Sequence, residues 1–268
     1  MFPILFSVGG VHIFSFSLLL VTAWCVFSFL FWRKLRAEAT SEQHIFDLMF
    51  QSTLQAVVWA RIGFVATHWY IFSNNFLKIV AFWVSPGLSF YSGLVAAMVT
   101  CIVMTRKAKI RVGLVLDAFA LSLPWAILVG KFGSLLDGSE VGNPASIAWA
   151  VHYVGHVGSR HPVQAYEMVA LIALGILMVF FEGRAMRDKW PFGLVGVWFI
   201  LLFAPIEFGL EFFKEHEVYW HMLSANQWIL VAFFAEALGA FYVRGGGREK
   251  LRPIVGTLYA KFSKRPTQ

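Results

Sequence analysis

Residues 163–189 read VQAYEMVALIALGILMVFFEGRAMRDK. Apolar side chains dominate the stretch from Val163 to Phe181, and three basic residues follow within the next eight positions. About 20 mostly apolar residues are enough for a helix to cross the ~30 Å hydrocarbon core of a bilayer. A basic connection after such a stretch is typical of a helix that ends in the cytoplasm. We therefore interpret this segment as a transmembrane helix.

The composition of the whole chain also indicates a membrane protein. Of its 268 residues, 59% are hydrophobic and only 14% are charged. A soluble domain carries about 25% charged residues, so this chain has too few charges to cover a water-soluble globule of its size. Composition therefore disfavours a soluble enzyme, a disordered chain and a nucleic-acid binder. Cys25 and Cys101 lie in apolar runs, where a thiol behaves as a small hydrophobic group.

Seven apolar stretches are candidates for membrane spans, and together they predict an all-α integral membrane protein. They are Val11–Trp32, Leu48–Phe72, Gly87–Thr105, Val112–Leu136, Val163–Phe181, Phe192–Phe213 and Ala225–Val243. We expect a single seven-helix transmembrane domain over residues 1–243. A basic cytoplasmic tail over residues 244–268 follows it.

The positions of the basic residues predict the orientation. After the first, third, fifth and seventh spans lie 17 of the 22 Lys and Arg residues. Cytoplasmic loops collect Lys and Arg, so we expect the N-terminus outside and the C-terminus in the cytoplasm. The connection between the fourth and fifth spans then forms an outer loop region. The same asymmetry explains the net charge of +7 without a nucleic-acid partner.

The charged residues that stand out inside or at the ends of the predicted spans are Arg61, Asp117, Lys131, Glu207 and Glu211. A charge at bilayer depth costs about 2.5–3.5 kcal/mol on insertion scales, so it usually faces an interior cavity or a partner. We expect an interior polar cavity that opens outward. For Asp117, an ion pair with a base at the inner end of its helix is the favoured alternative.

The outer ends of the spans are rich in glycine. Gly87 and Gly93 flank a Ser-Phe-Tyr sequence, and Gly130 and Gly133 flank Lys131. Glycine allows two helices to approach closely, and it also leaves backbone N–H groups open to a phosphate. Both interpretations remain open from the residues alone.

Six segments, in order along the chain, resemble motifs of the bacterial prolipoprotein diacylglyceryl transferase family. They are Phe6–Gly9, Arg61–Phe64, Gly87–Gly93, Gly130–Gly142, Arg160–Glu167, and Leu210–Lys214 followed by Gln227. Seven spans with the N-terminus outside are also the topology of that family. The match at Arg160–Glu167 is the closest of the six.

The resemblance implies an enzyme of the bacterial cytoplasmic (inner) membrane. Such an enzyme transfers the diacylglyceryl group of phosphatidylglycerol to the thiol of a lipobox cysteine in a preprolipoprotein, and glycerol phosphate leaves. The expected partners are therefore phosphatidylglycerol, the lipobox peptide and membrane lipid. We expect no metal and no cofactor. The reaction requires a deprotonated thiol, cations at the departing phosphate and an apolar groove for the acyl chains.

The resemblance also selects candidate site residues. The catalytic candidates are His161, Tyr91, Glu140 and Glu211. The candidates for binding phosphate and lipid are Lys131, Arg160, Arg61, Lys214, Ser89, Gly93 and Gly138. Two further candidates, Glu207 and Asp137, are interpreted as compensating changes.

Several candidates depart from the family pattern. The family has His at the position of Tyr91 and Arg at the positions of Lys131 and Lys214. Glu207 stands where the family has an Arg, which reverses the charge. We hypothesise that the Glu207 carboxylate pairs with Lys131 or Lys214.

Two alternative functions stay open at this point. A family member with an altered site would bind anionic lipid or a lipobox peptide without transferring the lipid. A channel or transporter would share only the helix count, and the sequence shows no internal repeat that favours it.

Overall fold

The computed structural model describes residues 2–9, 11–81, 84–215 and 221–246. Its elements, in chain order, are β1 (Ile4–Val8), β2 (Val11–Phe14), α1 (Ser15–Ala37), α2 (Glu42–Thr67), α3 (Trp69–Phe72), the 3-10 helix η1 (Phe76–Ile79), α4 (Phe90–Lys107), α5 (Val112–Asp137), β3 (Val151–His152), β4 (Ser159–Arg160), α6 (Val163–Arg187), α7 (Leu194–Glu211) and α8 (Ala225–Arg244).

Within the described ranges, seven long helices lie where the seven spans were predicted. Five of them, α1, α5, α6, α7 and α8, are long and apolar enough to cross a membrane. The chain is therefore a multi-pass membrane protein. The other two, α2 and α4, have a more polar composition. Helix α2 contains Glu42, Asp47 and Arg61, and α4 ends with Arg106 and Lys107.

The predicted start of the first span was wrong. Residues Val11–Phe14 form β2, which pairs antiparallel with β1, and α1 begins only at Ser15. Gly9 has a positive φ of 56° at the turn, and a Gly-Gly pair is a common signal for a hairpin. A short apolar run does not by itself distinguish a strand from the first turn of a helix.

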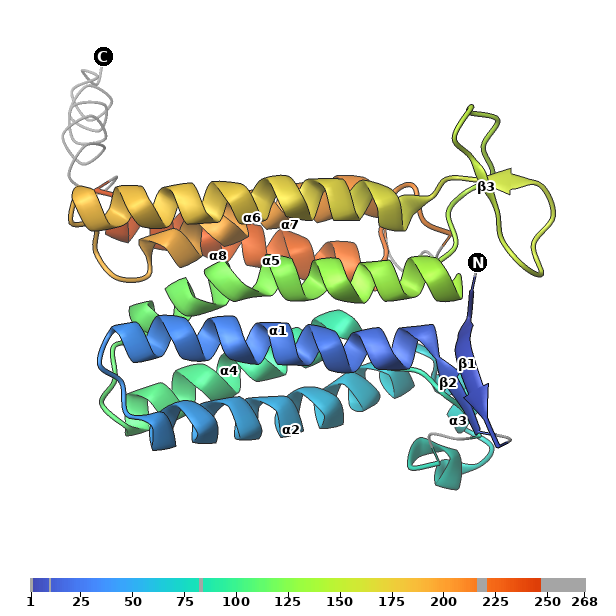
Figure 1. Ribbon diagram of the computed structural model, residues 1–268, viewed down its shortest axis with the longest axis horizontal. Helices are drawn as coiled ribbons and strands as arrows, with labels where there is room; N and C mark the ends of the chain where they lie inside the picture. Colours follow the sequence, from blue (N-terminus) through green and yellow to red (C-terminus); the bar gives the residue numbers. More distant parts are fainter. Residues whose placement is uncertain (1, 10, 82–83, 216–220, 247–268) are drawn as a thin grey trace, which may run out of the picture.

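Helix α5 lies at the centre of the bundle. Figure 1 shows it between a group formed by α6, α7 and α8 and a group formed by α1, α2 and α4. It packs against α1, α6 and α7, whereas α2 packs mainly on α4. Both hairpins and α3 lie at the end of the bundle where α5 ends (Figure 1). The site described below lies at this same end.

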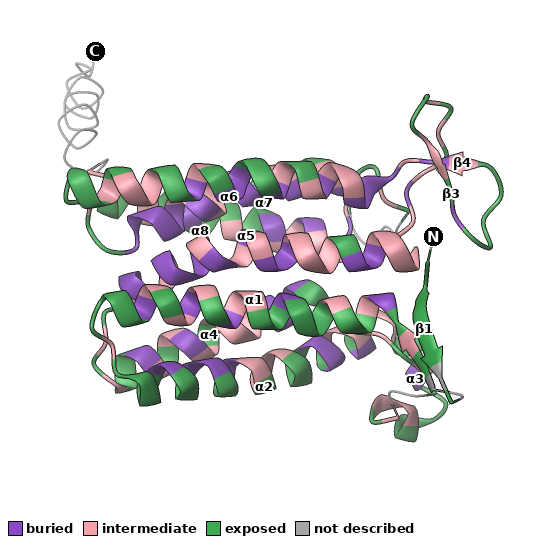
Figure 2. Ribbon diagram, in the orientation of Figure 1, coloured by how far each residue is buried: buried purple, intermediate pink, exposed green. Residues whose placement is uncertain are grey.

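The burial pattern suits a lipid environment. Exposed residues, green in Figure 2, recur along the outer helices α2 and α6, and many of them are large and apolar, such as Phe50 and Val169. The buried residues include several that are charged or polar, among them Glu167, Glu207 and Glu211. Polar groups turned inward and apolar groups turned outward are what a bilayer requires.

Among the residues that the structure describes, Asp117 forms no ion pair with a base, which corrects the favoured alternative. Its two carboxylate oxygens accept hydrogen bonds from the backbone N–H groups of Gly193 (2.7 Å) and Gly196 (2.8 Å). These groups lie at the start of α7, where N–H donors have no partner within the helix and the helix dipole favours an anion. The side chain on α5 therefore caps α7 at the end of the bundle opposite the hairpins.

The predicted basic tail begins where α8 ends, at Arg244. Residues 247–268 of that tail lie outside the described part of the chain.

Candidate functional site

Six charged side chains gather where α5 and α7 end and α6 begins. We call this group the glutamate–lysine cluster, and its members are Lys131, Glu140, Glu167, Glu207, Glu211 and Lys214. Five of the six were predicted as site residues from the sequence, and the structure brings all five together.

Two carboxylates bridge the two lysines. The Lys131 Nζ lies 2.7 Å from each Glu140 oxygen and 2.8 Å from Glu167 Oε2. The Lys214 Nζ lies 2.6 Å from Glu167 Oε1 and 3.6 Å from Glu140 Oε2. A third carboxylate, that of Glu211, lies 3.0 Å from the Lys214 Nζ. Each lysine is therefore held by at least two carboxylates.

The members of the cluster differ in their exposure to solvent. The Glu167 and Glu211 side chains are 0% and 1% exposed, whereas the Glu140 side chain is 34% exposed. Removing one partner from a buried ion pair costs about 3–5 kcal/mol because the other charge stays buried. Glu167 is thus fixed in place, and Glu140 is the bridging carboxylate that an incoming anion can most easily displace.

The end of α5 brings Glu140 back toward Lys131. Gly138 has a positive φ of 77°, and its N–H donates to the Ser134 carbonyl at 2.8 Å. A glycine in this left-handed conformation commonly ends a helix and turns the chain sharply. The structure therefore gives Gly138 the role of a helix cap.

The start of α6 holds the backbone of Glu140 in place. The buried Gln164 amide donates to the Glu140 carbonyl. The Tyr153 hydroxyl donates to Gln164 Oε1 at 2.7 Å. A loop that follows α5 is in this way tied to a helix that begins more than 20 residues later.

The two lysines determine the charge state of Glu140. Burial disfavours the ionised carboxylate, but the ammonium groups of Lys131 and Lys214 outweigh that effect and lower the pKa of Glu140 to about 2. The carboxylates of Glu140, Glu167 and Glu211 in turn raise the pKa of Lys214 well above its ordinary value, against the effect of burial. Both groups are therefore ionised at neutral pH.

Arg160 lies beside the cluster and connects the loops that follow α5 and α7. Its Nη1 donates to the Gly142 carbonyl at 3.1 Å and lies 2.6 Å from Glu215 Oε2. Gly142 also forms an isolated backbone bridge with Lys214. A side chain at Gly142 would collide with the His161 carbonyl, so these loops pack too closely for any larger residue.

His161 belongs to a group of aromatic rings. Its Nδ1 lies 3.1 Å from the Tyr166 hydroxyl, and its ring centroid lies 5.2 Å from that of Phe213. The Trp149 Nε1 donates to the same Tyr166 hydroxyl at 2.9 Å. Because Phe213 directly precedes Lys214, the aromatic group adjoins the cluster.

Tyr91 lies between the cluster and the apolar core. It is buried among the side chains of the core, and its hydroxyl is close enough to Glu207, Glu211 and Lys214 to interact with their charges. Asp137, the last residue of α5, forms no ion pair with any residue that the structure describes.

Besides Arg160 and Gly138, the predicted binding residues Arg61, Ser89 and Gly93 also lie outside the cluster. The Arg61 guanidinium donates to the backbone carbonyls of Lys78 (2.7 Å), Ile79 (2.8 Å) and Gly87 (3.0 Å), and so organises the connection before α4. The Ser89 and Ser92 hydroxyls bond to each other at 3.0 Å. A side chain at Gly93 would lie 3.0 Å from the Ala56 carbonyl, so this glycine lets α2 and α4 approach closely.

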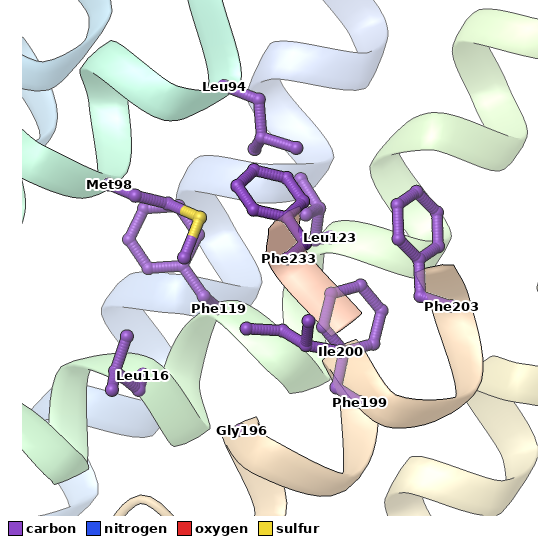
Figure 3. Close-up of a pocket in the computed structure, with 10 residues that line it drawn as sticks. All are labelled: Leu94, Met98, Leu116, Phe119, Leu123, Gly196, Phe199, Ile200, Phe203 and Phe233. Atoms are coloured by element: carbon purple, nitrogen blue, oxygen red, sulfur yellow. The ribbon is translucent and has the colours of Figure 1, made fainter. Parts of the chain in front are cut away.

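A narrow apolar cavity lies in the core of the bundle. Residues of α4, α5, α7 and α8 line it, and their side chains point toward one another in Figure 3. The lining includes Leu94, Phe119, Phe203 and Phe233. Its volume is about 20 Å³, which is room for little more than one water molecule.

Comparison with known proteins identifies the family. The family model for prolipoprotein diacylglyceryl transferase matches residues 3–243. The chain belongs to the prolipoprotein diacylglyceryl transferase family. The resemblance seen in the sequence is thus confirmed. The protein is accordingly a transferase that acts in lipoprotein maturation by diacylglyceryl transfer.

Curated relatives carry the same activity in their names. The phosphatidylglycerol–prolipoprotein diacylglyceryl transferase of Finegoldia magna is 25% identical over 85% of this chain and 89% of its own length. The enzyme of that name from Pseudoalteromonas atlantica is 29% identical over 80% of this chain and 75% of its own. The enzyme from Polynucleobacter necessarius is 27% identical over 85% of this chain and 90% of its own length.

Sequence reasoning did not select Glu167 as a site residue. Glu167 was considered only as the end of the segment Arg160–Glu167, yet its buried carboxylate joins the two lysines. The signal was present, because a glutamate in the second turn of an apolar span needs a partner. Asn226, which donates to Glu211 Oε1 at 2.7 Å, carried no such signal.

The hypothesised pairing of Glu207 with a lysine is not formed. Within the described ranges, Glu207 makes no ion pair, and other glutamates take both lysines. Its Oε1 is buried and accepts no hydrogen bond from any described residue. Glu207 therefore differs from Glu167 and Glu211, whose carboxylates form ion pairs with the lysines.

Proposed function

We propose that this protein transfers the diacylglyceryl group of phosphatidylglycerol to the lipobox cysteine of preprolipoproteins, and that the glutamate–lysine cluster holds the phosphate. Family membership supports the reaction, and the names of the relatives support the two substrates. The proposed location is the bacterial cytoplasmic membrane.

The proposed topology has seven spans, an outer N-terminus and a cytoplasmic C-terminus. Seven long helices support the count. Helices α1, α4 and α6 carry basic residues in their last turns, and these turns lie at the end of the bundle opposite the hairpins (Figure 1). Since cytoplasmic loops collect basic residues, the cluster then faces the outer side, where lipoprotein substrates emerge.

One observation carries the proposal for the phosphate. The Glu140 carboxylate contacts both lysines, and a phosphate presents oxygens that can accept from two ammonium groups in the same way. We assign Glu140 the role of a placeholder that the lipid phosphate displaces. Its pKa of about 2 makes it a weak proton acceptor, which favours this role over that of the catalytic base.

The lysines would then stabilise the leaving group. The cysteine sulfur attacks the glycerol carbon that carries the phosphate, the C–O bond breaks and a thioether C–S bond forms. The electron pair of the broken bond leaves with glycerol phosphate, so negative charge increases next to Lys131 and Lys214. Preorganised cations at that position lower the barrier.

We assign His161 the role of the base that accepts the proton of the cysteine thiol. An imidazole nitrogen can accept a proton from a thiol, which is the usual role of histidine as a general base. Its Nδ1 is held by the Tyr166 hydroxyl, which orients the ring. The other catalytic candidates are less suited, because Glu211 is bound to Lys214 and Asn226 and the phenol of Tyr91 is a poor base.

The acyl chains would occupy a widened form of the apolar cavity. The cavity is too small for a chain as it stands, but α4 forms one of its walls. Helices α2 and α4 pack mainly on each other and touch the rest of the bundle much less. An outward shift of this pair would open the cavity toward the lipid.

The test uses purified full-length protein in phosphatidylglycerol vesicles with a lipobox peptide. Mass spectrometry should detect a diacylglyceryl adduct on the peptide cysteine, and Lys131→Ala should abolish it. Glu236→Gln is the control, since it removes a glutamate from the exposed face of α8. A folded protein that binds the lipid or the peptide but yields no adduct would show a binding protein without transferase activity.

A further inference from the structure

A groove runs along the side of the helix pair formed by α2 and α4. Its volume is about 610 Å³, and we call it the α2–α4 groove. Its lining includes Asp47, Gln51 and Gln55 of α2 and Thr100, Val103 and Lys107 of α4. Among the described residues, none lines both this groove and the apolar cavity, and none of its lining belongs to the glutamate–lysine cluster. The α2–α4 groove is therefore a feature that the proposed reaction does not use.

The three polar residues of α2 form a stripe that enters the membrane. Asp47, Gln51 and Gln55 are four residues apart, so they share one face of the helix. At 1.5 Å per residue, Gln51 lies about 6 Å and Gln55 about 12 Å beyond Asp47 along the helix axis. Leu54 and Val58, which are exposed on the same part of α2, are side chains that suit lipid. In the proposed topology, two amide groups are therefore presented to the hydrocarbon core.

These amide groups have no partner among the residues that the structure describes. Gln51 is exposed and Gln55 is partly exposed, and neither side chain forms a hydrogen bond within the described chain. An amide without a hydrogen-bond partner is costly in an apolar medium. Acyl chains supply no donor or acceptor, and the side chains of the apolar segment of a signal sequence supply none either. The occupant that satisfies this groove is therefore a membrane helix with polar side chains at the same depth.

The groove also carries one charge of each sign at its cytoplasmic end. Asp47 lies in the second turn of α2 and Lys107 is the last residue of α4, and these helix ends lie opposite the hairpins (Figure 1). Neither residue forms an ion pair within the described ranges. A two-fold axis along the membrane normal relates two copies that face the same way, so residues of equal depth meet across it. A second copy therefore brings a lysine to each Asp47, and it brings amides, which both donate and accept, to the glutamines.

We propose that two copies of this protein associate through the α2–α4 groove, with Asp47 of each copy paired with Lys107 of the other. Opposite charges and amides then meet at matching depths, which makes the groove complementary to itself. The inference rests on the proposed topology and not on the transfer reaction. The glutamate–lysine cluster lies at the other end of the bundle, so the interface does not cover it.

Energy transfer between labelled copies measures the association. Full-length protein carrying a donor or an acceptor dye at its C-terminus is mixed and reconstituted at low density in phosphatidylglycerol vesicles. We expect energy transfer above the level of randomly placed proteins, and a decrease as added lipid dilutes the protein. Energy transfer at the random level would overturn the inference and leave the groove to another membrane protein. No substrate is present, so a preparation that fails to transfer lipid still reports association, and the adduct assay tests the transferase separately.

Charge reversal tests which residues meet. Asp47→Lys places lysine opposite lysine in the dimer, and Lys107→Asp places aspartate opposite aspartate. Each variant alone should associate about tenfold more weakly or worse, because like charges then face each other. A mixture of the two variants restores both opposite pairs, so energy transfer between them should return to the unmodified level. The control Asp188→Lys reverses an exposed charge at the same end of the bundle, after α6, and should leave association unchanged.

Two results with the variants would overturn the inference. One is association that neither single variant weakens, and the other is a mixture that stays as weak as each variant alone. If a variant does not fold, carbodiimide crosslinking of the unmodified protein decides the question, since this reagent joins a carboxylate to an amine in contact. Peptide mapping of a covalent dimer formed from isotope-labelled and unlabelled copies should find Asp47 joined to Lys107. A dimer joined only through other residues would refute the interface.

Discussion

Replacing Glu140 with glutamine should strengthen phospholipid binding. Glu140→Gln keeps the shape of the side chain and removes the negative charge that now contacts Lys131 and Lys214. A lipid phosphate entering the unmodified protein must displace this carboxylate from both ammonium groups. In the variant it displaces only a neutral amide.

The size of the effect follows from the ion pairs of Glu140. Lowering a pKa from 4.5 to about 2 corresponds to about 3.4 kcal/mol of preference for the ionised form. The Glu140 side chain is 34% exposed, and solvent screening reduces the value to about 1–2 kcal/mol. Since 1.4 kcal/mol is a factor of ten, we expect the KM for the lipid to fall about five- to thirtyfold.

Steady-state transfer to a fixed concentration of lipobox peptide, measured over a range of phosphatidylglycerol concentrations, checks this prediction. The variant should have a lower KM and a kcat within a few-fold of the unmodified protein. An unchanged KM together with a kcat reduced a hundredfold would refute the reasoning. Glu140 would then be the base that removes the thiol proton.

Three further predictions concern stability and are measured by thermal unfolding in detergent. Lys131→Met should destabilise the protein by about 3–5 kcal/mol, because it leaves the buried Glu167 with one cation fewer. The lowered pKa of Glu140 stabilises the folded state above about pH 4.5 and loses that contribution as the pH falls toward 2. Acidification over this range should therefore lower the melting temperature less in Glu140→Gln than in the unmodified protein. Asp117→Ala should cost about 1–2 kcal/mol by removing the cap of α7, whereas Asp188→Ala on the surface should have little effect.

The helices were predictable because hydropathy and length are local properties. The predicted starts of the fourth, fifth and seventh spans coincide with the first residues of α5, α6 and α8. The error at Val11–Phe14 arose because apolar residues suit a strand as well as a helix. The pairing of β2 with β1 depends on the turn between them, and the pattern of apolar residues does not indicate that turn.

The sequence predicted most of the residues that form the site, but not which of them contact one another. The cost of a charge in a membrane indicated that Lys131 and Glu207 need partners, but not which ones. Arg61 shows the limit most clearly, since its partners are backbone carbonyls of a connection that adopts its shape only in the folded protein. No residue type in the sequence marks a carbonyl as an acceptor for a particular guanidinium.

The contact between Asp117 and the start of α7 fixes the position of α5 relative to α7 along the bundle axis. Helices α5 and α7 run in the same direction, and Asp117 fixes α5 at Gly196. Lys131 lies 14 residues after Asp117 in α5, and Glu211 lies 15 residues after Gly196 in α7. At 1.5 Å per residue these are rises of about 21 and 22 Å along the two helices. A slip of one helical turn, about 5.4 Å, would part the lysines from their glutamates. In the proposed topology, a residue on the cytoplasmic side would thus determine the position of the cluster on the opposite side of the membrane.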